Sequence, residues 1–259
     1  MIFNTMMKRL FCVLIGVVCG CLPLVAQLAN RPLQERFDAC ETRVGRITLP
    51  YRVAHTGTAD NQQAPILVVV LHGSSAKGTD NVSQLTAAGV APVMHYLDSA
   101  NLPAHVLLPQ CPKKRRWSEP EDEGREMQAL IHAWISSYTT ENQIDKNRIY
   151  IIGASSGGAG VWKLLNDYSD SFAAGMLVAS YPRYVVDWVV AKTPVCCVVG
   201  ENDEVATPAE LAKFTDKLKA FGGNVFFSIL PDKDHYATCR DGFTTEALQW
   251  FFEQKRTNK

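Results

Sequence analysis

Residues 148–158 read RIYIIGASSGG, and this stretch decides which fold the chain can adopt. The near-continuous apolar run from Arg148 to Gly153 is typical of a strand that is covered on both faces. A helical pattern, Gly158 to Tyr168, begins only a few residues later. Between the two stands Gly153-Ala154-Ser155-Ser156-Gly157, a G-x-S-x-G pattern in the strand–turn–helix context that this motif requires.

Working outward, further apolar runs have the length of buried strands, and helical patterns lie between them. The other predicted strands are Ile66 to Leu71, His105 to Pro109, Ala173 to Ala179, Val195 to Gly200 and Asn224 to Leu230. The other predicted helices are Glu126 to Tyr138, Pro208 to Phe221 (with Thr207 as N-cap) and Thr244 to Gln254. Strand–helix alternation indicates a mostly parallel sheet with helices on both faces, an α/β fold. The segment from Arg43 to Ala54 alternates instead and predicts an antiparallel edge strand.

Composition excludes some functions. Lys+Arg and Asp+Glu each total 26, so the formal net charge is zero and no nucleic-acid partner is expected. The one basic run, Lys113 to Arg116, is followed by acidic residues and is interpreted as a solvated loop. No CxxC pair or zinc-ligand spacing is present, so no metal and no organic cofactor is expected.

The N-terminus has the pattern of a secretory signal. Lys8 and Arg9 precede an apolar run, Leu10 to Val18, that is short for a membrane span, and cleavage after Ala26 is expected. We therefore expect a signal peptide over 1–26, a single domain over 27–259, and an exported protein, periplasmic or secreted, without stable membrane insertion. Acylation at Cys21, as in a lipoprotein, is the less favoured alternative.

Cleavage after Ala26 would leave five cysteines, and their pairing stays open. These residues are Cys40, Cys111, Cys196, Cys197 and Cys239. The odd number means that at least one thiol would be free. Cys196 and Cys197 lie in an apolar run and are interpreted as small core residues that point to opposite faces of a strand.

Ser155 is the candidate nucleophile, and two later residues are candidates to activate it. A serine hydroxyl needs a base to take its proton, and His235 is the one histidine that follows Ser155. It falls in a predicted loop after the last strand, where the order Ser, Asp/Glu, His would place the base. Asp203, after the strand ending at Gly200, is preferred over Glu201 and Glu204 as the acid that orients His235.

A tetrahedral intermediate also needs hydrogen-bond donors for its oxyanion. The segment Leu71-His72-Gly73-Ser74 closes a predicted strand, and we assign the backbone N–H groups of Ser74 and Ser156 as the two donors. His72 is interpreted as a residue that shapes this loop rather than as a catalyst.

Five stretches resemble the esterase and "predicted peptidase" branch of the α/β-hydrolases, which is related to carboxylesterases, feruloyl esterases and polyhydroxybutyrate depolymerases. They are 71–81 (LHGSSAKGTDN), 107–117 (LLPQCPKKRRW), 145–162 (DKNRIYIIGASSGGAGVW), 200–208 (GENDEVATP) and the loop around His235. The resemblance implies the α/β-hydrolase fold and a Ser155–Asp203–His235 triad. It also implies that Trp117 borders the substrate cleft, although a packing role is an equal alternative. Ser156 and Ala159 depart from the family, which often has Met and Tyr there, so substrate preference can differ.

The function expected from these residues is hydrolysis of a carboxylic ester through an acyl-enzyme. The substrate would be a small-molecule or carbohydrate-linked ester. A serine peptidase of the prolyl-oligopeptidase-like type is the nearest alternative, and a binding protein that has lost turnover is a second. The complete order of Ser155, Asp203 and His235 argues against the binding protein.

Overall fold

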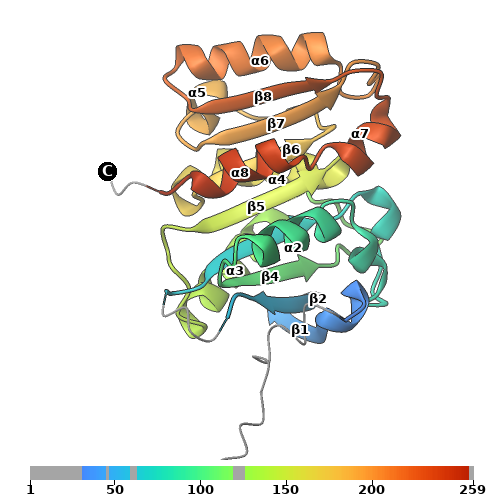
Figure 1. Ribbon diagram of the computed structural model, residues 1–259, viewed down its shortest axis with the longest axis vertical. Coiled ribbons are helices and arrows are strands. Elements are labelled where there is room, and N and C mark those ends of the chain that lie inside the picture. The colour runs from blue at the N-terminus through green and yellow to red at the C-terminus, as the bar shows by residue number, and fades with distance from the viewer. Residues whose placement is uncertain (1–30, 45–46, 59–62, 119–125, 257–259) are drawn as a thin grey trace, which may run out of the picture.

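The computed structural model describes residues 31–44, 47–58, 63–118 and 126–256. All strands in these ranges join one sheet with the order β1-β2-β4-β3-β5-β6-β7-β8 (Figure 1). The strands are β1 (Asp38–Val44), β2 (Ile47–Thr56), β3 (Ile66–Leu71), β4 (Ala104–Pro109), β5 (Ile149–Ala154), β6 (Ala174–Val178), β7 (Val195–Gly200) and β8 (Val225–Leu230). From β4 to β8 across the sheet the pairing is parallel, whereas β2 runs antiparallel to β1 and β4. The predicted α/β architecture is confirmed.

Helices cover both faces of this sheet. They are α2 (Val90–Ser99), α3 (Glu126–Glu141), α4 (Ser156–Asp167), α5 (Asp187–Val190), α6 (Pro208–Ala220), α7 (His235–Asp241) and α8 (Thr245–Glu253). Short 3-10 turns are η1 (Leu33–Arg36), η2 (Ser74–Ala76), η3 (Ser83–Thr86) and η5 (Ser169–Ser171). Buried side chains of α3, α4 and α6 share one core with the sheet, and those of α2 and α8 share the other. Figure 1 shows α2 and α8 on the face toward the viewer.

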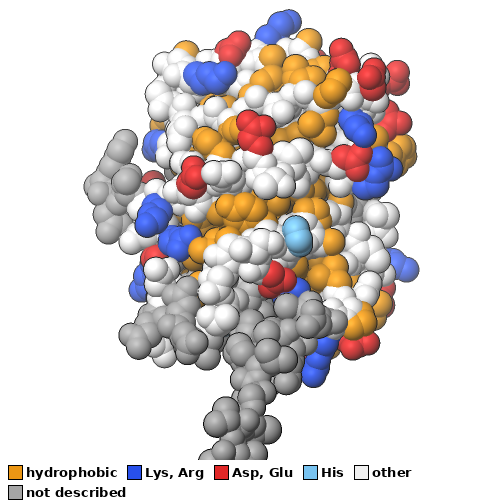
Figure 2. Space-filling model, in the orientation of Figure 1, with side chains coloured by type: hydrophobic (Ala, Val, Ile, Leu, Met, Phe, Trp, Pro, Cys, Tyr) orange, Lys and Arg blue, Asp and Glu red, His pale blue; other side chains and the backbone are white. Residues whose placement is uncertain are grey.

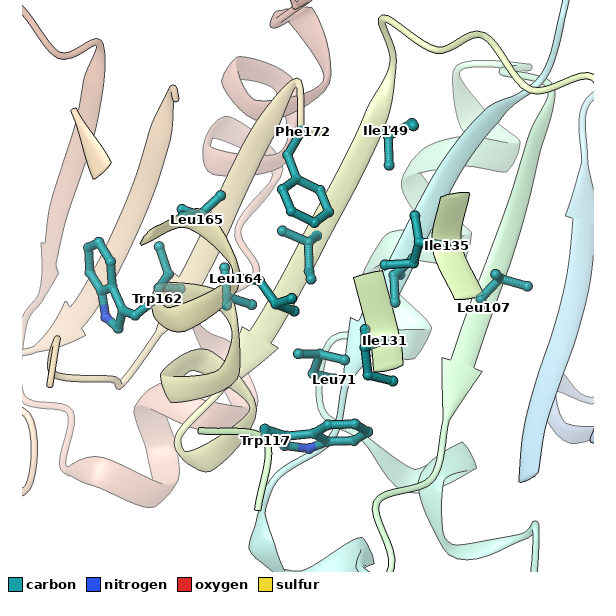
Figure 3. Close-up of a cluster of buried hydrophobic side chains, with 14 of the residues drawn as sticks. Leu71, Leu107, Trp117, Ile131, Ile135, Ile149, Trp162, Leu164, Leu165 and Phe172 are labelled. Carbon is teal, nitrogen blue, oxygen red and sulfur yellow. The ribbon is translucent and has the colours of Figure 1, made fainter. Parts of the chain in front are cut away.

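The two cores explain why the strands are apolar without interruption. Every residue of β3 is buried, and its alternate side chains enter opposite cores, with Val69 in one and Val68 in the other. Cys197 and Cys196 divide in the same way, and both are fully buried, as predicted. Figure 3 shows the core on the α3 and α4 side, where Leu71 at the end of β3 lies close to Trp117. A strand between two helical layers has no solvent face, so its sequence shows no alternation.

The predicted single strand over 43–54 is wrong in extent. It is a hairpin in which β1 and β2 pair from Asp38↔Val53 to Val44↔Ile47. The antiparallel edge is as expected, but β1 is the edge strand and β2 lies inside it. The missed signal is Gly45, because glycine between two extended runs is typical of a hairpin. Helix α2 was also not predicted.

Helix α6 begins at the N-cap that the sequence predicted, but the cap makes a different hydrogen bond. Thr207 occupies the N-cap position of α6, but its side chain accepts no backbone N–H; its hydroxyl donates instead to Glu210 Oε2 at 2.7 Å. The helix ends at Ala220, and Gly222 follows with a φ of +81°. A glycine in this left-handed conformation is a common helix stop.

The predicted signal segment, 1–26, lies outside the described residues. Within the described ranges, none of the helices has the length and apolar character needed to cross a membrane. Acidic and basic side chains are interspersed over the described surface in Figure 2, which agrees with the balanced charge of the sequence.

Candidate active site

Ser155 stands at the turn between β5 and α4 with a strained backbone. Its φ is 51° and its ψ is −120°, a combination that residues with a side chain rarely adopt. The turn is fixed from both sides, because Ser155 N–H donates to Val178 O at 2.9 Å and Ala159 N–H donates to Ser155 O at 3.0 Å. A sharp turn of this kind leaves the serine hydroxyl accessible just beyond the carboxyl end of β5.

The glycines around Ser155 are required by close approach of backbone. A Cβ on Gly153 would collide with the backbone of Gly157 and Gly158. A Cβ on Gly157 would collide with the carbonyl oxygens of Leu71 and His72. The motif therefore lets the end of β3 pass directly against the first turn of α4.

The structure brings Ser155, His235 and Asp203 together in one hydrogen-bonded chain. Ser155 Oγ lies 3.1 Å from His235 Nε2, and His235 Nδ1 lies 3.0 and 3.1 Å from the two carboxylate oxygens of Asp203. With the Nδ1 proton facing the carboxylate, Nε2 accepts from the serine hydroxyl. This is the geometry in which an imidazole can act as a base toward Ser155.

Asp203, and not Glu201 or Glu204, is the carboxylate against the imidazole. Asp203 is 2% exposed, and its Oδ1 accepts the backbone N–H groups of Val205 and Ala206 at 2.9 and 2.8 Å. These two bonds hold the carboxylate in one orientation. Both glutamates are exposed, and the sequence preference for Asp203 over them agrees with the geometry.

His235 was expected in a loop, but it is the first residue of α7. The helix begins there because Asp234 is its N-cap and accepts Ala237 N–H at 2.8 Å. Asp234 therefore fixes the start of the helix that carries the imidazole. The side chain of His235 is 15% exposed, so one edge of the ring is open to a substrate.

The proposed oxyanion loop lies beside the serine. Gly73 approaches Ala154, whose carbonyl oxygen would be 3.9 Å from a Cβ on Gly73, and Ser74 begins η2 immediately after. Ser156 is the first residue of α4, where helix geometry leaves backbone N–H groups without intrahelical acceptors. Both expected donors therefore lie on segments that meet at Ser155.

His72 acts as the structural residue that the sequence suggested. It is 1% exposed; Nδ1–H donates to Gly73 O at 2.6 Å, and Nε2 accepts Cys111 N–H at 2.9 Å. Burial lowers its pKa, which favours the neutral ring that both bonds require. The imidazole thus joins the loop after β3 to the loop after β4.

The sequence did not predict a second set of hydrogen bonds between these loops, which the side chain of Gln110 makes. This side chain is fully buried; its Nε2 donates to Ala76 O at 3.2 Å and Asp80 Oδ1 at 3.1 Å, and its Oε1 accepts Asn81 N–H at 2.8 Å. Asp80 also accepts the N–H groups of Val82 and Ser83, and these bonds, with that of Ser83 first, hold the pKa of its carboxyl well below its usual range. No local pattern predicts these contacts, because Gln110 is about thirty positions away in the sequence from the residues that it bonds.

Trp117 lies in the core rather than along an open cleft. It is 3% exposed and lies among the buried side chains of Figure 3. Its Nε1–H donates to His72 O at 2.9 Å. Its ring also meets the His72 ring edge-on, 5.1 Å between centroids. The packing alternative fits this position, and little side-chain surface remains for the substrate contact that the family resemblance implied.

Two cavities, of about 170 and 830 Å³, lie away from this site. Their linings include Ile149, Phe172 and Pro194, which stand at or just before the starts of β5, β6 and β7. Ser155, Asp203 and His235 follow the carboxyl ends of strands, where ligands bind in open α/β sheets. Among the described residues no cluster of three or more His, Cys, Asp or Glu could hold a metal ion.

Comparison with known proteins bears on the fold. A family model described as the prolyl oligopeptidase family matches residues 121–193. No curated protein matches the chain in sequence. Among solved structures, the chain is similar to a thermostable esterase, with 27% identity and a TM-score of 0.75, over 86% of this chain and 64% of the esterase. The chain therefore spans less than two thirds of that protein.

Two further solved structures share the fold at lower identity. One is a feruloyl esterase module from Clostridium thermocellum in complex with sinapinate, with 14% identity and a TM-score of 0.66, over 92% of this chain and 95% of the module. The other is an S-formylglutathione hydrolase from Staphylococcus aureus, with 15% identity and a TM-score of 0.62, over 83% and 96%.

The fold and these likenesses define the class: the chain has the α/β-hydrolase fold, as the sequence resemblance predicted. Within that class it is similar to a thermostable esterase and, over residues 121–193, to the prolyl oligopeptidase family.

Proposed function

We propose that this protein hydrolyses carboxylic esters through an acyl-enzyme, with Ser155 as nucleophile, His235 as general base and Asp203 as the orienting acid. The observation that carries the proposal is the chain of hydrogen bonds from Ser155 Oγ through the imidazole to a buried carboxylate. A buried carboxylate that accepts two backbone N–H groups and faces Nδ1 keeps the imidazole in the one tautomer that can act as the base.

The mechanism follows from the positions of these groups. His235 Nε2 takes the hydroxyl proton as Ser155 Oγ attacks the acyl carbon, and the Asp203 carboxylate stabilises the imidazolium. The N–H groups of Ser74 and Ser156 bind the oxyanion of the tetrahedral intermediate. His235 then gives its proton to the departing alcohol, and a water molecule, activated in the same way, releases the acid and frees Ser155.

The test is hydrolysis of p-nitrophenyl esters, from acetate to a long acyl chain, by wild type, Ser155→Ala and Ser137→Ala. Ser137 is an exposed serine on α3 and controls for the substitution itself. We expect turnover by wild type and Ser137→Ala, and a loss of at least about a thousandfold in kcat for Ser155→Ala. Labelling of Ser155 by a fluorophosphonate would show that the serine is activated. Full activity in Ser155→Ala would overturn the proposal.

Peptide hydrolysis is the second candidate, and the match to the prolyl oligopeptidase family over 121–193 favours it. An ester and an amide with the same acyl group separate the two functions. We expect the rate enhancement over spontaneous hydrolysis to be far larger for the ester than for the amide. Comparable enhancement of both reactions would favour the peptidase.

We further propose that the substrate is a small-molecule or carbohydrate-linked ester and that the protein is exported. The likeness to a feruloyl esterase module supports the first statement, and the charged and apolar pattern of residues 8–18 supports the second. Sequencing the N-terminus of the processed protein tests export: a start at Gln27 is expected. A lipid-modified Cys21 as the first residue would favour the lipoprotein alternative.

A further inference from the structure

The surroundings of the imidazole define where one half of an ester must lie. In the proposed mechanism, His235 Nε2 gives its proton to the oxygen of the departing alcohol, so that oxygen must come within hydrogen-bonding distance of Nε2. The alcohol half of the ester therefore lies beside the imidazole. Side chains that flank the ring then contact the alcohol, and not the acyl chain.

Helix α7 supplies two side chains that flank this ring. Cys239 follows His235 by four positions and so shares its helix face, and its Sγ lies 3.9 Å from Nε2. Tyr236 places its ring 5.8 Å from the imidazole, centroid to centroid, at 76°. One is a partly buried thiol and the other an aromatic ring, so this wall of the site presents apolar surface next to the reacting nitrogen.

Tyr236 is unusual in its exposure. At 83% it is the most exposed of the large hydrophobic side chains in the described ranges, ahead of Tyr184 at 70%. An aromatic ring that is held edge-on by the imidazole and otherwise open to solvent offers a flat face to a bound group. Val205 adds a second apolar side chain at this edge; it is 60% exposed, and its N–H is bonded to Asp203.

The charge around α7 restricts the alcohol further. Glu204, Asp232 and Asp234 are exposed carboxylates in the segments that follow β7 and β8. The two cations of the same segments, Lys233 and Arg240, are both paired with Asp241. The excess of negative charge in these segments repels an alcohol that itself carries a negatively charged group.

We infer that α7 is the alcohol-binding wall of the site, with Tyr236 as the substrate-contact residue that selects esters of uncharged aromatic alcohols. The inference rests on the proposed esterase function. Of the two substrate classes proposed there, it favours the small-molecule ester over the carbohydrate-linked ester, because a sugar is not an aromatic alcohol.

Acetate esters of ethanol and of benzyl alcohol test this, because they share an acyl group and differ in the alcohol alone. For each ester, kcat/KM is measured for wild type, Tyr236→Ala, Tyr236→Phe and Tyr184→Ala, and the ratio of wild type to variant cancels the intrinsic reactivity of the ester. We expect Tyr236→Ala to lose about ten- to hundredfold on benzyl acetate and less than about threefold on ethyl acetate. Tyr236→Phe keeps the ring and should restore most of the loss.

Tyr184→Ala is the matched control, because it removes an exposed tyrosine whose segment is bonded to Lys163 on α4 and not to His235. We expect it to change neither ratio. A second series, p-nitrophenyl esters of increasing acyl length, should show the same loss for Tyr236→Ala at every length, because the alcohol is constant.

Three results would overturn the inference. An equal loss on ethyl and benzyl acetate would mean that Tyr236 only positions His235. No loss on either would mean that the alcohol lies elsewhere, and a loss that grows with acyl length would place the acyl half on α7. If wild type hydrolyses no ester at all, the proposed function fails and this inference fails with it.

Discussion

The two sides of Ser155 are built by different means. On one side stand the side chains of His235 and Asp203, each on a short segment that follows a strand and each within about 3 Å of its partner. On the other side are the backbone N–H groups assigned to Ser74 and Ser156. The position of the first depends on how the loop after β3 is held, and that of the second on the start of α4. The first side depends on which side chains are present, and the second depends on where the backbone lies.

This difference decides how each side responds to mutation. A side-chain group can be removed outright by one substitution, whereas a backbone donor can only be displaced through the residues that support it. Those supports are two buried side chains: His72, which bonds backbone of both loops, and Gln110, which reaches from the loop after β4 to backbone of the loop after β3. The comparison therefore predicts a large, local loss on one side and smaller, coupled losses of rate and stability on the other.

The largest effect is expected for Asp203→Asn. An amide in place of the carboxylate favours the wrong imidazole tautomer, and kcat should fall by about ten-thousandfold. The matched control is Glu204→Gln, an exposed neighbour that should change kcat by less than about twofold. Steady-state kinetics on a p-nitrophenyl ester measures both. A loss below tenfold for Asp203→Asn would show that the acid is not part of the proposed mechanism.

Gly157→Ala should break the junction between the two sides. Its methyl group would have to displace the backbone of Leu71 and His72, and we expect the free energy of unfolding to fall by about 3 kcal/mol. Urea denaturation measures this. Gly73→Ala is the control for stability, because a Cβ there meets nothing closer than 3.9 Å. Equal stability of the two variants would contradict the close approach at Gly157.

Gln110→Ala tests the backbone side alone. Loss of its three hydrogen bonds should loosen the loop that carries Ser74, and we expect kcat to fall about tenfold, less than removal of an oxyanion donor costs. KM should change little, because the effect is on the transition state. Gln249→Ala, an exposed glutamine on α8, is the control. Lower stability with an unchanged kcat would show that Gln110 supports the fold and not the site.

The smallest effect is expected far from both sides, at His105. Its ring meets His55 at 4.2 Å and Tyr138 Oη at 3.0 Å; burial lowers its pKa to about 4. Because this pKa lies below the value near 6.5 in the unfolded chain, the stabilisation is complete above pH 6.5 and is lost as pH falls toward 4.

We expect that loss to reach about 1–2 kcal/mol, after allowance for solvent screening of a half-exposed group. His105→Gln should flatten the dependence of unfolding free energy on pH between 4 and 6.5, whereas His95→Gln, at an exposed position, should leave it as in wild type. Equal slopes for wild type and His105→Gln would contradict this assignment.

Sequence patterns predicted the sheet well because buried parallel strands are apolar runs of fixed length. β3 and β7 have the predicted bounds, and the other predicted parallel strands differ by one residue at one or both ends. The hairpin β1–β2 was read as one strand, since alternation alone does not show where a chain reverses. Short helix α7 was missed because its start depends on a capping bond at Asp234 rather than on apolar spacing.

For the site, the sequence could name residues with chemistry but not those that hold them. Ser155, Asp203 and His235 stood out by type and by their place after strands, and the structure brings all three together. Gln110 carries no motif, and its role depends on contacts that only the fold creates. Trp117 shows the converse: a conspicuous residue can be conspicuous because it packs.

None of the five cysteines within the described ranges forms a disulfide. Cys196 and Cys197 belong to opposite cores, so sheet geometry itself keeps these neighbours apart. A disulfide between Cys196 and Cys197 would require one of the two side chains to leave its core.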